Sequence, residues 1–207
     1  MPKNYISNDS ASIRMFKNGF MESLSKVHYS VPLFIYIPVI AVFIYRAFAV
    51  AQNGIGWFFI YLFAGLFIWT ITEYILHRYV FHFVPKSKWG LRLHFIFHGV
   101  HHDYPRDAKR LVMPPSASIP LAVLFYFLFL WLLPAAWMNG FFAGFLIGYL
   151  IYDMMHYAIH HANFKNGILK HIKQHHMLHH YSDATKGYGV SSSIWDIFFQ
   201  SGFKNKK

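Results

Sequence analysis

The chain has 207 residues, no cysteine and a formal net charge of +11, and its composition is 56% hydrophobic and 21% aromatic. Only 13% of the residues are charged, whereas a soluble domain has about 25%. Without cysteine, the chain cannot form disulfides, thiolate metal sites or cysteine nucleophiles. The length favours one domain, or at most two.

Residues 1–30 precede the first strongly apolar stretch and are expected to form an amphipathic segment. Within residues 12–28, Ile13, Phe16, Phe20 and Leu24 follow one another at steps of three and four. This spacing predicts a helix with one apolar face. The face would lie either in the membrane interface or against the rest of the protein.

Four apolar stretches follow, at residues 31–50, 56–76, 117–134 and 137–157. Each is long enough for a helix across a bilayer about 30 Å thick. Very short links join the first stretch to the second and the third to the fourth, which predicts two helical hairpins. The predicted fold class is therefore all-α, an integral membrane protein with four transmembrane helices.

The basic residues lie almost entirely on one predicted side of the membrane. Residues 1–30 hold four Lys and Arg, residues 77–116 hold seven and residues 158–207 hold seven, while Arg46 is the exception. Because short cytoplasmic loops are enriched in Lys and Arg, both termini and these segments are predicted to be cytoplasmic. This placement explains the positive charge without a nucleic-acid partner, and residues 77–116 and 158–207 are expected to form a helical cap.

Histidine is the most informative residue type, with fifteen in the chain. None lies in the middle of a predicted span. On a helix, residues at i, i+3 and i+4 share a face. The HxxHH sets 98–102 and 176–180 could therefore each present three imidazoles in one direction, and His156 and His160 could present two more.

His77 and His82 are five residues apart, which is about 140° around an α-helix. They either point to different metals or the helix loosens between them. Ten clustered histidines are too many for one ion, so we expect two ions with about five nitrogens each. The predicted ligands are His77, His82, His98, His101, His102, His156, His160, His176, His179 and His180. The remaining five, which are expected at the surface or behind the ligands, are His28, His94, His161, His171 and His175.

Acidic residues lie close to these clusters in the sequence. Glu73, Asp153 and Asp183 are candidate hydrogen-bond partners of the imidazoles, because metal-bound histidine usually donates its other N–H to such a group. Each carboxylate could equally pair with Arg78 or a nearby lysine.

The pattern favours redox-active metals. Imidazole binds zinc, copper, iron and nickel, but unactivated C–H bonds of lipids react only with a strong oxidant, and zinc has no redox chemistry. We therefore predict two iron ions acting with O₂ on a lipid, although zinc could occupy the purified protein.

Four segments resemble a known family, the fatty acid 2-hydroxylases of the fatty acid hydroxylase and sterol desaturase superfamily. They are EYILHRYVFH, HGVHHDYPRDAKRLVMPP, YDMMHYAIHH and LKHIKQHHMLHHYSDATKGYGVSSSIWDIFF. The resemblance covers roughly residues 70–205. Its most specific parts are RLVMPP and the run from YGVSS to WD.

The resemblance implies that the ten histidines bind the metals. It also implies insertion of one oxygen atom at carbon 2 of a long acyl chain, free or in a sphingolipid, with O₂ and two electrons. The chain lacks the HPGG haem motif of some members. Electrons are therefore expected from a separate protein, cytochrome b5-like or ferredoxin-like, with its reductase. Arg110 could hold an acyl carboxylate or headgroup, or lie at the lipid headgroup level.

Two alternatives remain from the sequence. One is a sterol or carotenoid hydroxylase or a lipid desaturase of the same superfamily. The other is a non-enzymatic metal-binding or transport protein, although a transporter needs polar ligands near the bilayer midplane, where this chain has none. A bacterial inner membrane is the favoured location and the endoplasmic reticulum is the alternative.

Overall fold

The computed structural model describes residues 4–52 and 54–203, and every regular element in these ranges is a helix. The elements are α1 (Gly19–Leu24), α2 (Val31–Ala49), α3 (Ile55–Ile75), η1 (Leu76–Phe81), α4 (Lys88–His94), η2 (Phe95–Gly99), α5 (Val100–Asp103), α6 (Pro115–Leu132), α7 (Ala135–His161), α8 (Gly167–Tyr181) and α9 (Ile194–Phe198). The two η elements are short π-helices. The all-α prediction is confirmed.

Four helices are long and apolar enough to span a membrane, as the sequence predicts. They cover Val31–Ala49, Ile55–Phe81, Pro115–Leu132 and Ala135–His161. The second and fourth run further toward the histidine clusters than expected, because η1 continues α3 without a break and α7 extends to His161. Helix α7 is the central one, since 72% of its span is buried, against 22%, 22% and 11% for the others.

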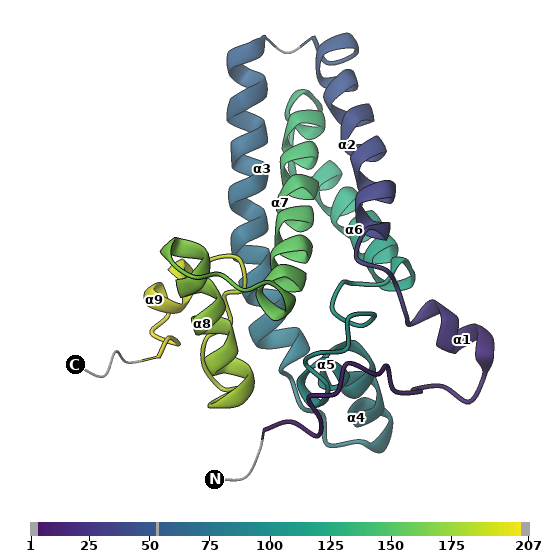
Figure 1. Cartoon of the computed structure of the whole chain (residues 1–207). Coiled ribbons are helices and arrows are strands. Elements are labelled where there is room, and N and C mark those ends of the chain that lie inside the picture. The colour runs from purple at the N-terminus through teal and green to yellow at the C-terminus, as the bar shows by residue number, and fades with distance from the viewer. Residues whose placement is uncertain (1–3, 53, 204–207) are drawn as a thin grey trace.

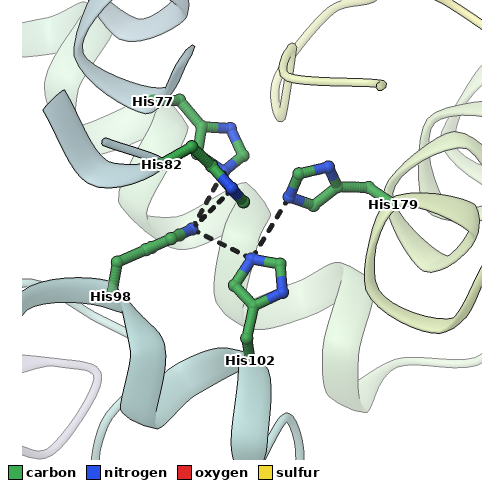
Figure 2. A group of neighbouring side chains, drawn as sticks. All are labelled: His77, His82, His98, His102 and His179. Carbon is green, nitrogen blue, oxygen red and sulfur yellow. Dashed lines mark hydrogen bonds between the residues drawn. The ribbon is translucent and has the colours of Figure 1, made fainter. Parts of the chain in front are cut away.

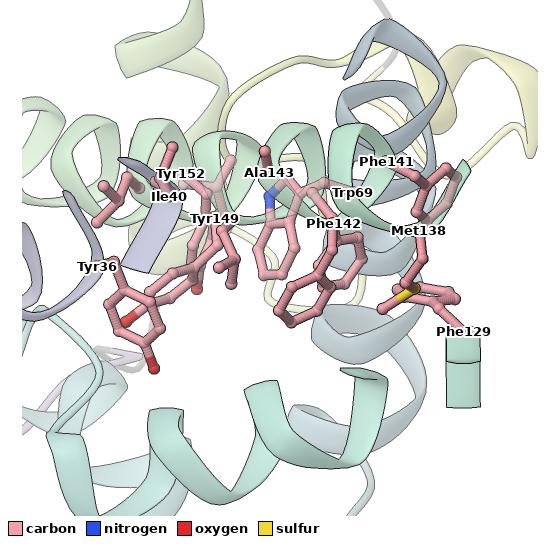
Figure 3. Packing of buried hydrophobic residues seen from close by; sticks show 14 of the residues in the cluster. Tyr36, Ile40, Trp69, Phe129, Met138, Phe141, Phe142, Ala143, Tyr149 and Tyr152 are labelled. Carbon is pink, nitrogen blue, oxygen red and sulfur yellow. The ribbon is translucent and has the colours of Figure 1, made fainter. Parts of the chain in front are cut away.

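Helices α3 and α7 pack closely because glycine faces backbone at two places. A Cβ atom at Gly65 would lie 1.9 Å from the Phe141 carbonyl oxygen, and one at Gly144 would lie 1.9 Å from the Leu62 carbonyl oxygen. Aromatic residues of α7 fill the space towards α2 and α6 (Figure 3). Large apolar side chains such as Phe34, Phe63 and Trp131 remain exposed on the outer helices, where lipid would cover them.

The remaining elements gather at one end of the four long helices. In Figure 1, α4 and α5 lie on one side of this end, and α8 and α9 lie on the other. The N-terminal segment also packs here, because the amides of Ile6 and Ser7 bond to the Asp103 carbonyl and that of Val27 to the Lys109 carbonyl. We call this end, formed by residues 4–30, 77–114 and 162–203, the cap.

The helix expected over residues 12–28 is much shorter than predicted. It covers Gly19–Leu24 and begins where the Asn18 side chain accepts hydrogen bonds from the amides of Phe20 and Met21. The preceding chain cannot continue the helix, because Met15 and Phe16 donate their amides to the Glu22 carboxylate. The apolar periodicity therefore spans a short helix and the non-helical segment that precedes it.

Candidate metal centre

The structure brings the ten predicted histidines together in two groups of five. The first group is His77, His82, His98, His102 and His179, and the second is His101, His156, His160, His176 and His180. Within each group, one ring nitrogen of every member lies within 4.8 Å of the others. Figure 2 shows the first group converging from η1, from the η2–α5 segment and from α8.

The helix loosens between His77 and His82, so these residues share a group. The His82 amide donates to the His77 carbonyl at 3.1 Å, the i to i+5 bond of a π-helix. This wider turn places residues five apart above one another. The alternative that the two histidines point to different metals is therefore wrong.

Each HxxHH set divides between the groups, contrary to the expectation of three imidazoles in one direction. His98 and His102 point into the first group and His101 into the second, while His176 and His180 point into the second and His179 into the first. The i+3 and i+4 positions lie about 100° apart around a helix. Both groups contain histidines of α5 and of α8. The angle of about 100° therefore directs adjacent histidines of one helix into different groups.

The distances between ring nitrogens fit a shared ion. In the first group, Nε2–Nε2 distances are 3.1 Å from His77 to His98 and 3.0 Å from His98 to His102. In the second group, His101 and His156 are 2.9 Å apart. A metal–nitrogen bond of about 2.1 Å and a 90° angle would separate two ligand nitrogens by about 3.0 Å.

Backbone carbonyls fix which nitrogen faces the centre. The Nδ1–H groups of His77, His179 and His156 donate to the carbonyls of Tyr188 (2.5 Å), Lys186 (2.6 Å) and Leu111 (3.1 Å), respectively. The proton on Nδ1 leaves the Nε2 lone pair free for a metal. No pattern in the sequence identifies these partners, since every residue carries a carbonyl.

Burial favours the neutral form of the grouped histidines in the cap, which is the form that binds metal. Burial, followed by the neighbouring imidazoles, holds the pKa values of His98, His101, His102, His176 and His180 well below the usual range. Burial lowers the pKa of His82 to about 2 and that of His179 to about 4. Buried neutral nitrogens whose lone pairs face one another repel, and a cation between them removes this repulsion.

Each of the three candidate carboxylates accepts hydrogen bonds from backbone amides near the site. Glu73 accepts from the amides of Val190 and Ser191, and Asp153 accepts from the Met113 amide and the Tyr149 hydroxyl. Asp183 accepts from Thr185 and pairs with Lys186. In the part of the chain that the structure describes, none of the three receives a hydrogen bond from an imidazole, so their expected direct contact with the ligands is not observed.

The five other histidines lie outside both groups. His175 donates to Asp196 at 3.0 Å. Asp196 is fully buried and was not singled out from the sequence, although it belongs to the WD motif.

A large apolar cavity adjoins the metal centre. It has a volume of about 930 Å³, and its wall includes His98 of the first group and His101 and His156 of the second. Apolar residues of the N-terminal segment, η1, α4 and α6 make up most of the remaining wall. The cavity thus extends from both histidine groups to a membrane-spanning helix.

Arg110 also borders this cavity, but its guanidinium is occupied. It donates to the Glu22 carboxylate (2.9 Å), the Ser25 hydroxyl (2.9 Å) and the Ile13 carbonyl (2.6 Å). Arg110 therefore attaches the N-terminal segment to the rest of the cap. The expectation that it holds an acyl carboxylate does not match these contacts.

The four apolar helices, the two histidine groups and the adjoining cavity define an integral membrane protein with a centre that can hold two metal ions. The model of the family described as fatty acid hydroxylase matches residues 62–201. The chain belongs to this family.

Similar proteins support this assignment. The chain is 37% identical to the dihydroceramide fatty acyl 2-hydroxylase FAH1 of Arabidopsis thaliana, over 90% of this chain and 78% of that protein. It is 38% identical to the ceramide very long chain fatty acid hydroxylase SCS7 of Saccharomyces cerevisiae, over 96% of this chain but 50% of the relative. A solved structure, described as full-length scs7p with only the hydroxylase domain visible, matches with a TM-score of 0.85 and 36% identity over 93% of this chain and 72% of that one. The chain thus spans about four-fifths of the plant relative and half of the yeast relative.

Proposed function

We propose that this chain is an O₂-dependent fatty acid 2-hydroxylase, which acts on a long-chain acyl group that is free or part of a sphingolipid. The main support is the cavity of about 930 Å³ that joins apolar walls to histidines of both groups. The reaction would replace one C–H bond at carbon 2 by C–OH. The second oxygen atom of O₂ would leave as water, with two electrons and two protons supplied from outside.

The cavity walls favour an acyl chain over a polar substrate. Phe16, Phe81 and Leu121 are among the side chains that line the cavity, and burial of each substrate methylene would contribute about 0.8 kcal/mol. This contribution corresponds to about fourfold in affinity per methylene. The walls would hold the chain, and the histidine side would receive its carboxyl-proximal end.

We assign the ten grouped histidines as ligands of two iron ions, five from each group. Iron, when bound, would supply the redox chemistry that zinc lacks, namely reduction of O₂ and oxidation of the C–H bond; zinc could still occupy the purified protein. The chain's own part is to hold the imidazoles neutral, with Nε2 directed inward. Glu73 and Asp183 would hold the segment that carries the Tyr188 and Lys186 carbonyls. Asp153 would hold the backbone of Met113 in the cavity wall.

Electrons would come from a separate donor protein, cytochrome b5-like or ferredoxin-like, with its own reductase. The cap contains most of the Lys and Arg residues, and an acidic donor would be attracted to such a surface by electrostatic steering. The same charge distribution favours a cytoplasmic cap. We propose a bacterial inner membrane as the location, with the endoplasmic reticulum as the alternative.

The decisive experiment is expression in a host that lacks hydroxylated lipids, followed by mass spectrometry of the released acyl chains. We expect 2-hydroxy acids, each heavier than its precursor by one oxygen atom. His179→Ala should abolish the product, whereas His171→Ala, outside both groups, should retain it. Products altered in a ring or a double bond would instead identify a sterol or carotenoid hydroxylase or a desaturase.

A further inference from the structure

One short segment, residues 186–191, orients two members of the first histidine group. The Lys186 carbonyl accepts from His179 Nδ1 and the Tyr188 carbonyl from His77 Nδ1. In the second group, His156 bonds instead to the Leu111 carbonyl. The two groups therefore depend on different stretches of backbone.

Asp196 holds this segment from one side. Its Oδ1 atom accepts from the Tyr188 amide at 2.9 Å and from the Ser201 hydroxyl at 2.7 Å. Its Oδ2 atom accepts from the Gly189 amide at 2.7 Å and from His175 at 3.0 Å. Four donors thus converge on one carboxylate that is 0% exposed. Glu73 holds the next two residues, Val190 and Ser191, through their amides.

The carboxylate of Asp196 stays ionised although it is buried. Burial raises its pKa, but the hydrogen bonds from His175, Gly189, Ser201 and Tyr188 outweigh this effect and lower it. An ionised carboxylate can accept at all four lone-pair positions. The hydrogen bonds from backbone amides to this charge are stronger than bonds between neutral groups.

The segment approaches Asp196 more closely than a side chain would allow. A Cβ atom at Gly189 would lie 2.0 Å from the Ser192 carbonyl oxygen and 3.0 Å from Asp196 Oδ2. Gly187 has a φ of +72°, a conformation that favours glycine. The two glycines let the backbone fold around the carboxylate, so the direction of the Tyr188 carbonyl depends on Asp196.

We propose that Asp196 is a positioning residue for the first metal ion, acting on His77 through the Tyr188 backbone and leaving the second ion unaffected. This inference rests on the proposed function, in which both groups bind metal. Loss of the hydrogen bond between a metal-binding imidazole and its partner typically lowers metal affinity about 10- to 100-fold. We expect a misdirected Tyr188 carbonyl to weaken this bond at His77. Asp196→Asn keeps the size but replaces an acceptor oxygen by an NH₂ group that faces N–H and O–H donors.

The test uses the full chain in detergent, loaded with Co²⁺, whose visible absorption reports its coordination. Metal content and competition with a chelator then give the number and affinity of bound ions. We expect two ions in the parent chain and, in Asp196→Asn, one ion held as tightly as before and one held about 10- to 100-fold more weakly. Leu146→Ala, a core truncation in α7 away from the site, controls for general loss of stability.

Two histidine variants, each combined with Asp196→Asn, show which of the two ions is weakened. His160→Ala leaves only the first group intact, so adding Asp196→Asn should remove the remaining tight ion. His179→Ala leaves only the second group intact, so adding Asp196→Asn should change nothing. If Asp196→Asn does not fold, Ser201→Ala removes one donor to Asp196 and should give a smaller change in the same direction.

Unchanged affinity at both ions in Asp196→Asn would overturn the inference while leaving the proposed function intact. Equal weakening of both ions, as expected for Leu146→Ala, would also overturn it. A parent chain that binds no Co²⁺ at either group would refute the metal centre itself, and with it both proposals.

Discussion

At the scale of single residues, the Glu22 carboxylate helps to hold the N-terminal segment in place. Burial raises the pKa of Glu22, but hydrogen bonds from Lys26, Phe16 and Met15 and the charge of Arg110 outweigh it and lower the pKa from 4.5 to about 2. Because the pKa of Glu22 is lower in the folded protein, its ionised carboxylate stabilises the folded segment fully above pH 4.5. The contribution is lost as the pH falls from 4.5 to about 2.

We expect the amides of Met15 and Phe16 to lose protection from hydrogen exchange over this pH window, after correction for the intrinsic rate. Glu22→Gln should already show the low protection at neutral pH. Protection that is independent of pH in the parent chain would show that Glu22 does not hold the segment.

The sequence predicted that these ten histidines would gather in two sets of about five, but not which histidine would join which set. Helical spacing identifies His98, His101 and His102 as a set, yet only the packing of α7 and α8 around α5 shows which group each one joins. The Tyr188, Lys186 and Leu111 carbonyls have no side-chain signature. Glu73 and Asp153 were predicted to bond to imidazoles, but their partners are backbone amides, a serine hydroxyl and a tyrosine hydroxyl.

At the scale of elements, the contact between α3 and α7 depends on two glycines. We expect Gly65→Ala and Gly144→Ala each to lower the free energy of unfolding by about 1–3 kcal/mol or more, because the added methyl group overlaps backbone. Gly56→Ala, with nothing within 4 Å of its Cβ, is the matched control. Thermal melting in detergent measures the difference, and equal midpoints for all three variants would contradict the packing.

The short helix α9 carries exposed apolar side chains. Ile197 and Phe198 of α9 are 74% and 70% exposed. The neighbouring Trp195 donates to Thr70 of the span α3 at 3.0 Å. This contact places the exposed face of α9 next to a membrane-spanning helix. The sequence reading assigned residues 158–207 to the cap without identifying this apolar face.

Because the chain has no cysteine, single cysteines can carry spin labels without further changes. We expect labels at Ile197→Cys and Phe198→Cys to be accessible to dissolved oxygen and protected from a water-soluble nickel complex in bilayers. The exposed Lys170→Cys on α8 should show the reverse. Full accessibility of both α9 labels to the nickel complex would place this helix in water.

At the scale of the whole molecule, bound metal would connect segments that are far apart in the sequence. Each group joins three or more elements, and ligand binding at 1,000 times Kd stabilises a fold by about 4 kcal/mol per site. Removal of metal by a chelator should therefore lower the thermal midpoint substantially. The double variant His160→Ala/His179→Ala should show little further change, and an unchanged midpoint in the parent chain would contradict the cross-linking role.

The fold was predictable at this scale because hydropathy and charge are strong signals over twenty residues. The π-helix at η1 illustrates the limit: the five-residue step from His77 to His82 required either separate metals or an altered helix. The sequence alone did not decide between them. The helix predicted over residues 12–28 was too long, because the amides of Met15 and Phe16 donate to the Glu22 carboxylate instead of to helix carbonyls.

Adjacent residues in α5 and in α8, His101 beside His102 and His179 beside His180, face opposite groups, and the rings of His102 and His180 stack across the boundary at 4.2 Å. The distance between the two groups thus depends mainly on the turn of about 100° between adjacent residues of a helix. Because α5 and α8 each contribute histidines to both groups, a shift of either helix would move both groups together. Natural variation in either helix would have to preserve both sites at once.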